Sequence, residues 1–215
     1  MRPVMCMITD GRLAAGRSAD SLVESVATAA RAGVDLIQIR ERGVDDRTLV
    51  ALIGRCVAAV QGTRARIVVN DRLDAALAGG AHGVHLRSDS YPAARARTIT
   101  PAGFLVGRSV HSVEDAIRAS QPDSVDYLIF GTVFATSSKP GQKPAGVSAL
   151  ADTVRATPVP VLAVGGVTAD NAALVAGAGA SGVAAIGLFV DGSPRSLGAS
   201  MAGVTRAFDT PGGGS

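Results

Sequence analysis

The chain has 215 residues, of which 47% are hydrophobic, and a formal net charge of +3. This composition supplies enough apolar side chains for a large buried core, which excludes a wholly disordered or fibrous protein. The 26 glycines accompany 3% aromatic residues and no tryptophan. A core of Val, Ile, Leu and Ala with many tight turns favours a parallel α/β fold over an aromatic-rich β-sandwich.

The charges and the cysteines bear on partners and on the compartment. Basic residues are scattered, with neither the charge run nor the aromatic platform typical of nucleic-acid binding, so we expect no nucleic-acid partner. Cys6 and Cys56 lie in apolar surroundings without CxxC spacing, which indicates buried free thiols in a reducing compartment. We find no signal-peptide pattern and no uncharged apolar stretch of about 18 residues. We therefore expect a cytoplasmic protein without a membrane partner, and the sequence is compatible with a homo-oligomer.

Short apolar runs alternate with longer amphipathic stretches along the whole chain. The apolar runs have the length and β-branched content of buried parallel strands. The predicted strands cover residues 4–9, 36–40, 66–70, 83–86, 105–110, 127–130, 159–164 and 183–186. The predicted helices cover residues 21–32, 45–60, 71–78, 113–119, 147–155, 169–176 and 196–208.

This alternation predicts one TIM (β/α)8 barrel over residues 1–208, followed by a glycine-rich disordered C-terminal tail over 209–215. An open doubly wound sheet is the alternative. In a barrel the loops that follow the strands meet at one end, where substrates bind. The polar residues that end each predicted strand are therefore the candidates for a functional site.

The second predicted strand carries Gln38, Arg40 and Arg42 at alternate positions. Alternate residues of a strand share a face, so these side chains point together into the barrel mouth. Guanidinium groups are costly there unless they meet an anion, and their planar fork suits phosphate oxygens. An internal ion pair with Glu41 is the alternative.

The third predicted strand ends in Asn70 and Asp71. Carboxylate and carboxamide oxygens suit Mg²⁺, which itself holds phosphates in many enzymes. The alternative is that these residues cap the following helix.

The loop over residues 131–146 is rich in hydroxyl groups and includes a lysine. Thr136, Ser137, Ser138 and Lys139 follow one another there, a composition typical of a cradle for phosphate or pyrophosphate. A solvated surface loop is the alternative.

The last two predicted strands end in glycines. Gly165 and Gly166 follow one strand, and Ile186 and Gly187 end the other. Glycine allows the backbone N–H groups to approach a phosphate at this end of a barrel. Ordinary turn chemistry is the alternative at any single glycine.

Taken together and in this order, these segments resemble the thiamine phosphate synthase family, whose relatives include the thiazole tautomerases. The resemblance extends over nearly the whole chain, from Ile8-Thr9-Asp10 to Ile186-Gly187-Leu188. The matching segments between them are Gln38-Ile39-Arg40-Glu41-Arg42, Val69-Asn70-Asp71-Arg72, Gly83-Val84-His85-Leu86, Gly107-Arg108-Ser109-Val110-His111, Thr136-Ser137-Ser138-Lys139 and Ala163-Val164-Gly165-Gly166-Val167.

The family's activity is what this resemblance implies for the chain. The family is a group of transferases in thiamine biosynthesis that joins 4-amino-2-methyl-5-hydroxymethylpyrimidine pyrophosphate to thiazole phosphate, releasing pyrophosphate and thiamine phosphate. The resemblance implies that Gln38 and Ser109 hold the pyrimidine and that Asp71 binds Mg²⁺. It implies phosphate contacts from Arg40, Arg42, Asn70, Thr136, Ser138 and Lys139, and a thiazole phosphate site at Gly165, Ile186 and Gly187. It implies catalytic roles for Arg40, Lys139 and Ser109.

The sequence departs from the family pattern at two places. Ser90 stands where the family carries a second Mg²⁺ aspartate, with Asp89 one residue earlier, and Gly187 replaces a serine. Thr132 stands where the tautomerases have a histidine, and the Thr-Ser-Ser-Lys loop is intact, which favours the synthase. Two alternatives follow: a thiazole tautomerase that transfers protons through His85, His111 or Glu41, and a non-catalytic regulator that binds thiazole or thiamine phosphate.

Overall fold

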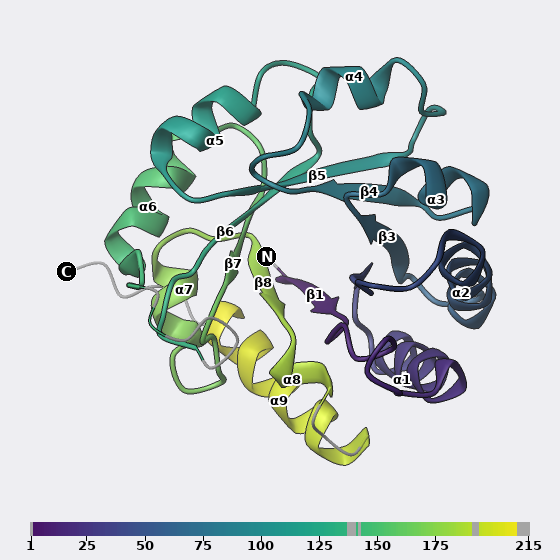
Figure 1. Cartoon of the computed structure of the whole chain (residues 1–215). Helices are drawn as coiled ribbons and strands as arrows, with labels where there is room; N and C mark the ends of the chain where they lie inside the picture. The colour runs from purple at the N-terminus through teal and green to yellow at the C-terminus, as the bar shows by residue number, and fades with distance from the viewer. Residues whose placement is uncertain (1, 137–140, 142, 191–193, 210–215) are drawn as a thin grey trace.

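Eight parallel strands close into one barrel, with helices in a ring around it (Figure 1). The computed structural model describes residues 2–136, 141, 143–190 and 194–209. Each strand pairs with the next in the chain, and the last pairs with the first through Val4 beside Gly182 and Met7 beside Ala185. The predicted TIM barrel is therefore confirmed, and an open sheet is excluded because the barrel has no strand edge.

All eight predicted strands are present, and their ends differ from prediction by at most two residues. The seventh strand begins after Pro160, which has no backbone N–H to donate to its neighbour. The strands are β1 Val4–Ile8, β2 Leu36–Ile39, β3 Arg66–Asn70, β4 Gly83–Leu86, β5 Leu105–Val110, β6 Tyr127–Gly131, β7 Val161–Val164 and β8 Gly182–Ala185.

The helices of the described chain include the seven predicted ones and two short additions. The helices are α1 Ala19–Arg31, α2 Asp46–Ala59, α3 Leu73–Ala78, α4 Ala93–Arg97, α5 Val113–Ala119, α6 Gly146–Ala156, α7 Ala172–Gly177, α8 Gly187–Val190 and α9 Pro194–Asp209. Helices α4 and α8 have five and four residues, too few to show a helical repeat in the sequence. Helix α9 includes Asp209, and the other residues of the proposed tail, 210–215, lie outside the described chain.

Local signals account for where several helices begin. Ser112 caps α5, because its side chain accepts a hydrogen bond of 3.1 Å from the Asp115 N–H. Helix α3 begins two residues later than predicted. Asp71 has a positive φ of 62°, a left-handed conformation that cannot continue a right-handed helix.

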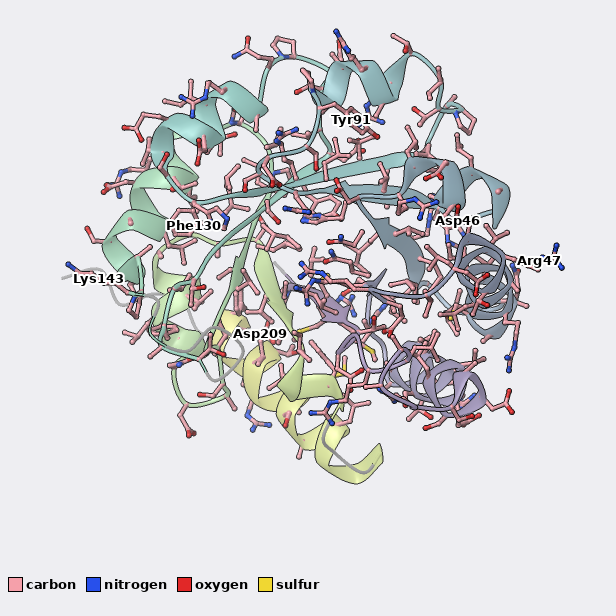
Figure 2. All side chains as sticks on the ribbon, viewed as in Figure 1. Asp46, Arg47, Tyr91, Phe130, Lys143 and Asp209 are labelled. Carbon is pink, nitrogen blue, oxygen red and sulfur yellow. The ribbon has the colours of Figure 1, made fainter. Side chains whose placement is uncertain are left out.

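Apolar residues form two layers on either side of the strands. The larger layer lies between strands and helices, and Figure 2 shows Phe130 on the side of β6 that faces α5 and α6. A smaller cluster fills the barrel interior and consists of Cys6, Ile8, Leu36, Val68, Tyr127, Ile129, Leu162 and Ala184. Both cysteines are buried and free, as predicted, and burial raises the pKa of Cys6 and Cys56 to about 12.

The barrel interior has room for its one large ring because β5 carries Gly107. A Cβ atom at Gly107 would lie 2.1 Å from Cζ of Tyr127. Only a glycine fits at this point, so the sequence brings Tyr127 into the interior, close to the polar residues at the strand ends. None of the described helices is long and apolar enough to cross a membrane.

Candidate active site

A cavity of about 890 Å³ opens at the end of the barrel where the strands terminate. This volume is in the range of small-molecule sites, which are commonly about 300–1,000 Å³. Most of the predicted site residues line it: Gln38, Arg40, Arg42, Asn70, Asp89, Ser109, Thr136, Gly165, Ile186 and Gly187. The side chains of Asp71 and Ser90 do not line it. Ser138 and Lys139 lie outside the described residues.

Gln38 supplies an acceptor without a partner at the bottom of this cavity. Its side chain is 3% exposed, and its Nε2 donates to Oδ1 of Asn70 over 2.9 Å. Its Oε1 is buried and has no hydrogen-bond partner among the described residues. An unpaired buried acceptor is costly, and a bound ligand that donates a hydrogen bond would remove the cost.

His85 lies behind the second polar residue of the cavity floor, Ser109. The Nε2 atom of His85 lies 2.9 Å from Oγ of Ser109, and Nδ1 lies 3.2 Å from the Tyr127 hydroxyl. The ring stacks on that of Tyr127 with centroids 5.6 Å apart. Burial, and secondarily the charge of Arg108, lowers the pKa of His85 to about 3. The imidazole is therefore neutral near pH 7 and orients Ser109 through a hydrogen bond.

Arg40 and Arg42 line the cavity. Neither guanidinium has a hydrogen bond or ion pair with any residue that the structure describes. Glu41, the predicted alternative partner, turns away: its carboxylate accepts the N–H of Gly11 at 3.3 Å and of Leu13 at 2.9 Å. Burial, and then the neighbouring Arg42, lowers the pKa of Arg40. Two like charges held together beside an open cavity favour a bound anion.

Asp71 lies beside the cavity in a small network of charges. The Ser90 hydroxyl donates to Oδ1 of Asp71, and a nitrogen of Arg87 lies 4.0 Å from its Oδ2. Arg87 also donates to Asp89 over 2.5 Å. Asp71 does not cap α3: the N-cap residue is Arg72, and it makes no side-chain capping bond.

These residues do not form a magnesium site by themselves. Within the part of the chain that the structure describes, no three His, Cys, Asp or Glu side chains are grouped so as to hold a metal ion. Mg²⁺ commonly needs one or two carboxylates together with substrate phosphates. Asp71 offers one carboxylate, and the guanidinium of Arg87 stands next to it.

The opposite side of the cavity is built from glycines. Gly165 has a φ of 99°, and a Cβ there would lie 2.4 Å from Cγ2 of Thr132. Gly166 has a φ of 61°, and its Cβ would lie 2.3 Å from the Ala135 carbonyl oxygen. Both positions require glycine, so the backbone comes to the surface of the cavity. Gly187 begins the short helix α8, an arrangement that binds phosphate in many barrels.

The three histidines lie in three different environments. His82 is structural, because its Nδ1 accepts the Ile67 N–H over 2.9 Å. His85 is buried, and its imidazole lines the cavity next to Ser109, to which it is hydrogen-bonded. His111 lines the cavity and contacts the Gly131 carbonyl through Nδ1.

Several cavity residues were not predicted from the sequence. Thr168, Ala169 and Ser200 line the cavity, and Tyr127 supports His85 from behind. Arg87 also lines the cavity, directly after β4, as the rule that strand ends carry function predicts. Ser200 comes from α9, far from any strand end, and no sequence signal marks it.

Comparison with known proteins identifies the family. Residues 5–189 match the family described as thiamine monophosphate synthase. The chain is 40% identical over 185 residues to the thiamine-phosphate synthase of Methanoculleus marisnigri, covering 86% of each chain. It is 39% identical over 194 residues to that of Roseiflexus castenholzii, covering 90% of this chain and 83% of the relative.

A solved structure gives the same result. The thiamine phosphate pyrophosphorylase of Pyrococcus furiosus superposes with a TM-score of 0.79 at 30% identity, covering 96% of this chain and 95% of that one. The family match covers most of the chain, and both relatives and structure carry the same activity in their names. The chain belongs to the thiamine monophosphate synthase family.

Proposed function

We propose that this chain is a thiamine-phosphate synthase that couples 4-amino-2-methyl-5-hydroxymethylpyrimidine pyrophosphate to thiazole phosphate. The observation that carries the proposal is one cavity with two separate places for anions. Arg40 and Arg42 stand on one side and have no ion-pair partner among the described residues, and the backbone at Gly165 and Gly187 forms another side. Two phosphorylated substrates need such an arrangement, and the relatives are named thiamine-phosphate synthases.

Gln38 and Ser109 suit the pyrimidine. The free Oε1 of Gln38 accepts a hydrogen bond from an amino group. Ser109, fixed by His85, offers its hydroxyl to a ring nitrogen. An aminopyrimidine presents a donor and an acceptor side by side, so these two residues match its polar edge.

The reaction needs no nucleophile from the protein. The bond between the pyrimidine CH₂ carbon and the pyrophosphate oxygen breaks, and its electron pair leaves with pyrophosphate. The ring amino group stabilises the cation that remains. The thiazole nitrogen then donates its lone pair to that carbon, forming the C–N bond of thiamine phosphate and a thiazolium cation. Arg40 and Arg42 favour the first step because negative charge grows on the leaving group beside them.

Three further assignments belong to the proposal. Asn70 and Thr136, together with Ser138 and Lys139 from the loop outside the described residues, complete the pyrophosphate contacts. Asp71 would hold a Mg²⁺ that arrives with pyrophosphate. A cytoplasmic location fits the two buried free cysteines, Cys6 and Cys56.

One assay separates the proposal from its alternatives. The purified chain is supplied with pyrimidine pyrophosphate, thiazole phosphate and Mg²⁺, and thiamine phosphate is measured by its conversion to fluorescent thiochrome phosphate. Time-dependent product supports the synthase. Isomerisation of the thiazole alone would support a tautomerase, and saturable binding without either reaction would support a regulator. No product from folded protein would overturn the proposal.

A further inference from the structure

Arg87 occupies the edge of the cavity where the resemblance leads us to expect metal ligands. It directly follows β4, and it lines the cavity together with Arg40 and Arg42. Its side chain is 49% exposed and extends toward Asp71 and Asp89. In the free chain, a cation therefore contacts both of the carboxylates at this edge that could bind a metal.

The loop that carries Arg87 is held in place from two directions. Ser90 accepts the Arg87 backbone N–H over 2.9 Å, and its hydroxyl donates to Asp71. The Arg108 guanidinium, from β5, donates to the carbonyl oxygens of Ser88 at 2.9 Å, Ser90 at 2.8 Å and Tyr91 at 2.8 Å. The backbone at Arg87 is thus held in place before any ligand binds, so only the side chain of Arg87 needs to move to reach a ligand.

The carboxylates at this edge are already engaged. Oδ1 of Asp71 accepts the Ser90 hydroxyl, and Oδ2 of Asp89 accepts from Arg87. A divalent cation would have to displace or tolerate the nearby guanidinium, because like charges repel over this distance. An incoming polyphosphate faces the opposite situation. The Arg87–Asp89 pair is half exposed to solvent and is therefore a weak contact that an anion can replace.

The neighbouring cations of the cavity also favour an anion at this edge. Arg87 is close enough to Arg40 to lower the pKa of that guanidinium, in addition to the effects of burial and of Arg42. The described residues give Arg40 and Arg42 no ion pair. Arg87 extends this cationic field from the end of β2 to the end of β4 along the edge of the cavity.

We propose that Arg87 binds the pyrophosphate directly and supplies part of the positive charge that a second metal carboxylate would otherwise recruit. This inference rests on the proposed function for the identity of the anion. It makes two claims: that the chain holds pyrophosphate without Mg²⁺, and that the free chain binds divalent metal weakly.

The first claim is tested with inorganic pyrophosphate as the probe. Its binding to the full chain is measured by isothermal titration calorimetry in excess EDTA and again in Mg²⁺. Arg87→Ala is expected to weaken binding in EDTA by about tenfold or more, as for loss of a hydrogen bond from a charged donor. Arg87→Lys keeps the charge but loses the planar fork, so its affinity for pyrophosphate is expected to lie between those of wild type and Arg87→Ala.

Arg155→Ala is the matched control for the loss of one positive charge. Arg155 lies in the last turn of α6, at the other end of the barrel, and pairs with Asp152. Its removal is expected to change pyrophosphate binding by less than about twofold, since screening weakens charges beyond the Debye length of about 10 Å. Equal binding by Arg87→Ala and wild type in EDTA would overturn the inference.

The second claim is tested with Mn²⁺ as a paramagnetic substitute for Mg²⁺. Electron paramagnetic resonance measures free Mn²⁺ in the presence of the chain without pyrophosphate. The double variant Arg87→Gly/Ser90→Asp removes the guanidinium and adds a carboxylate, and we expect it to bind Mn²⁺ about tenfold or more tightly than wild type. Equal Mn²⁺ affinity in both proteins would overturn the inference.

These tests separate the inference from the proposed function. If the chain binds pyrophosphate through Arg87 but forms no thiamine phosphate, the anion site is supported and the proposed synthase activity is overturned. If the chain forms thiamine phosphate but binds pyrophosphate independently of Arg87, the synthase activity is supported and the role of Arg87 is overturned.

Discussion

The imidazole of His85 separates the cavity residue Ser109 from the buried hydroxyl of Tyr127, with Nε2 2.9 Å from Ser109 Oγ and Nδ1 3.2 Å from the Tyr127 oxygen. The Tyr127 hydroxyl is buried and needs an acceptor, and Nδ1 is the one the described structure offers. That assignment places the imidazole proton on Nε2, where it donates to Ser109. The Ser109 hydroxyl proton is then available to a substrate in the cavity.

Replacement of Ser109 by alanine tests this donor. We expect kcat/KM for the pyrimidine substrate to fall by about tenfold, the effect of one hydrogen bond between neutral groups. The KM for thiazole phosphate should hardly change, because the proposed function assigns that substrate to the glycine side. Ser148→Ala, at an exposed position of α6, is the control and should behave as wild type. If Ser109→Ala had the same kcat/KM as wild type, Ser109 would not bind the pyrimidine substrate.

The neutral state of His85 predicts a pH-dependent stability. The pKa of His85 is lowered from 6.5 to about 3 in the folded chain, so the unfolded chain binds more protons between these values. The contribution of neutral His85 to the free energy of unfolding should therefore be fully present above pH 6.5 and should be lost as the pH falls toward 3.

His85→Gln isolates this contribution, because the carboxylates and His82 are common to both proteins. Urea unfolding of wild type and His85→Gln is compared across the range from neutral to acid pH. The wild type should lose more stability on acidification than the variant. Parallel curves would show that protonation of His85 does not oppose folding.

Gly107→Ala tests the packing that admits Tyr127 to the barrel interior. The added Cβ would lie 2.1 Å from the Tyr127 ring, and such overpacking costs about 1–3 kcal/mol. Gly198→Ala, in the middle of α9 with no atom within 4 Å of the new Cβ, is the matched control. It should gain about 0.5–1 kcal/mol from helix propensity. Thermal or urea unfolding measures both, and unchanged stability of Gly107→Ala would contradict the packing described.

Gly165→Ala separates the two substrate regions. Its φ of 99° and the 2.4 Å approach to Thr132 mean that alanine must shift the backbone at the phosphate end of the cavity. We expect the KM for thiazole phosphate to rise by about tenfold, equivalent to about 1.4 kcal/mol, with little change in the KM for pyrimidine pyrophosphate. Gly177→Ala, with open space around its Cβ, is the control. An equal rise in both KM values would indicate general misfolding rather than a local role.

The sequence predicted the barrel and most residues around the cavity for a simple physical reason. Buried parallel strands form continuous apolar runs, and their ends all meet at one mouth. Gln38 lies in β2, and Arg40 and Arg42 follow the strand at alternate positions, so strand geometry predicted that all three face the mouth. Helices α4 and α8 escaped prediction because a helix of one turn has no repeat to detect.

Partner choice was not predictable in the same way. Glu41 adjoins both arginines in sequence, yet its carboxylate binds the backbone of Gly11 and Leu13. The pairing of Arg87 with Asp89 depends on the path of a loop, and the support of His85 by Tyr127 joins strands β4 and β6, which are not neighbours in the sheet. Such contacts are set by three-dimensional packing, and no local spacing encodes them.

The proposed function requires the cationic side of the cavity to drive release of pyrophosphate during coupling. The most direct measurement is the single-turnover rate of thiamine phosphate formation by wild type, Arg40→Ala and Arg47→Ala. Arg47 projects into solvent from the outer side of α2 (Figure 2) and provides the charge-matched control. We expect wild type and Arg47→Ala to form product at the same rate, and Arg40→Ala to be slower by about 10²-fold, as for loss of one preorganised electrostatic contact. Absence of product from the wild type, or an Arg40→Ala rate equal to that of wild type, would contradict this role of the cationic side.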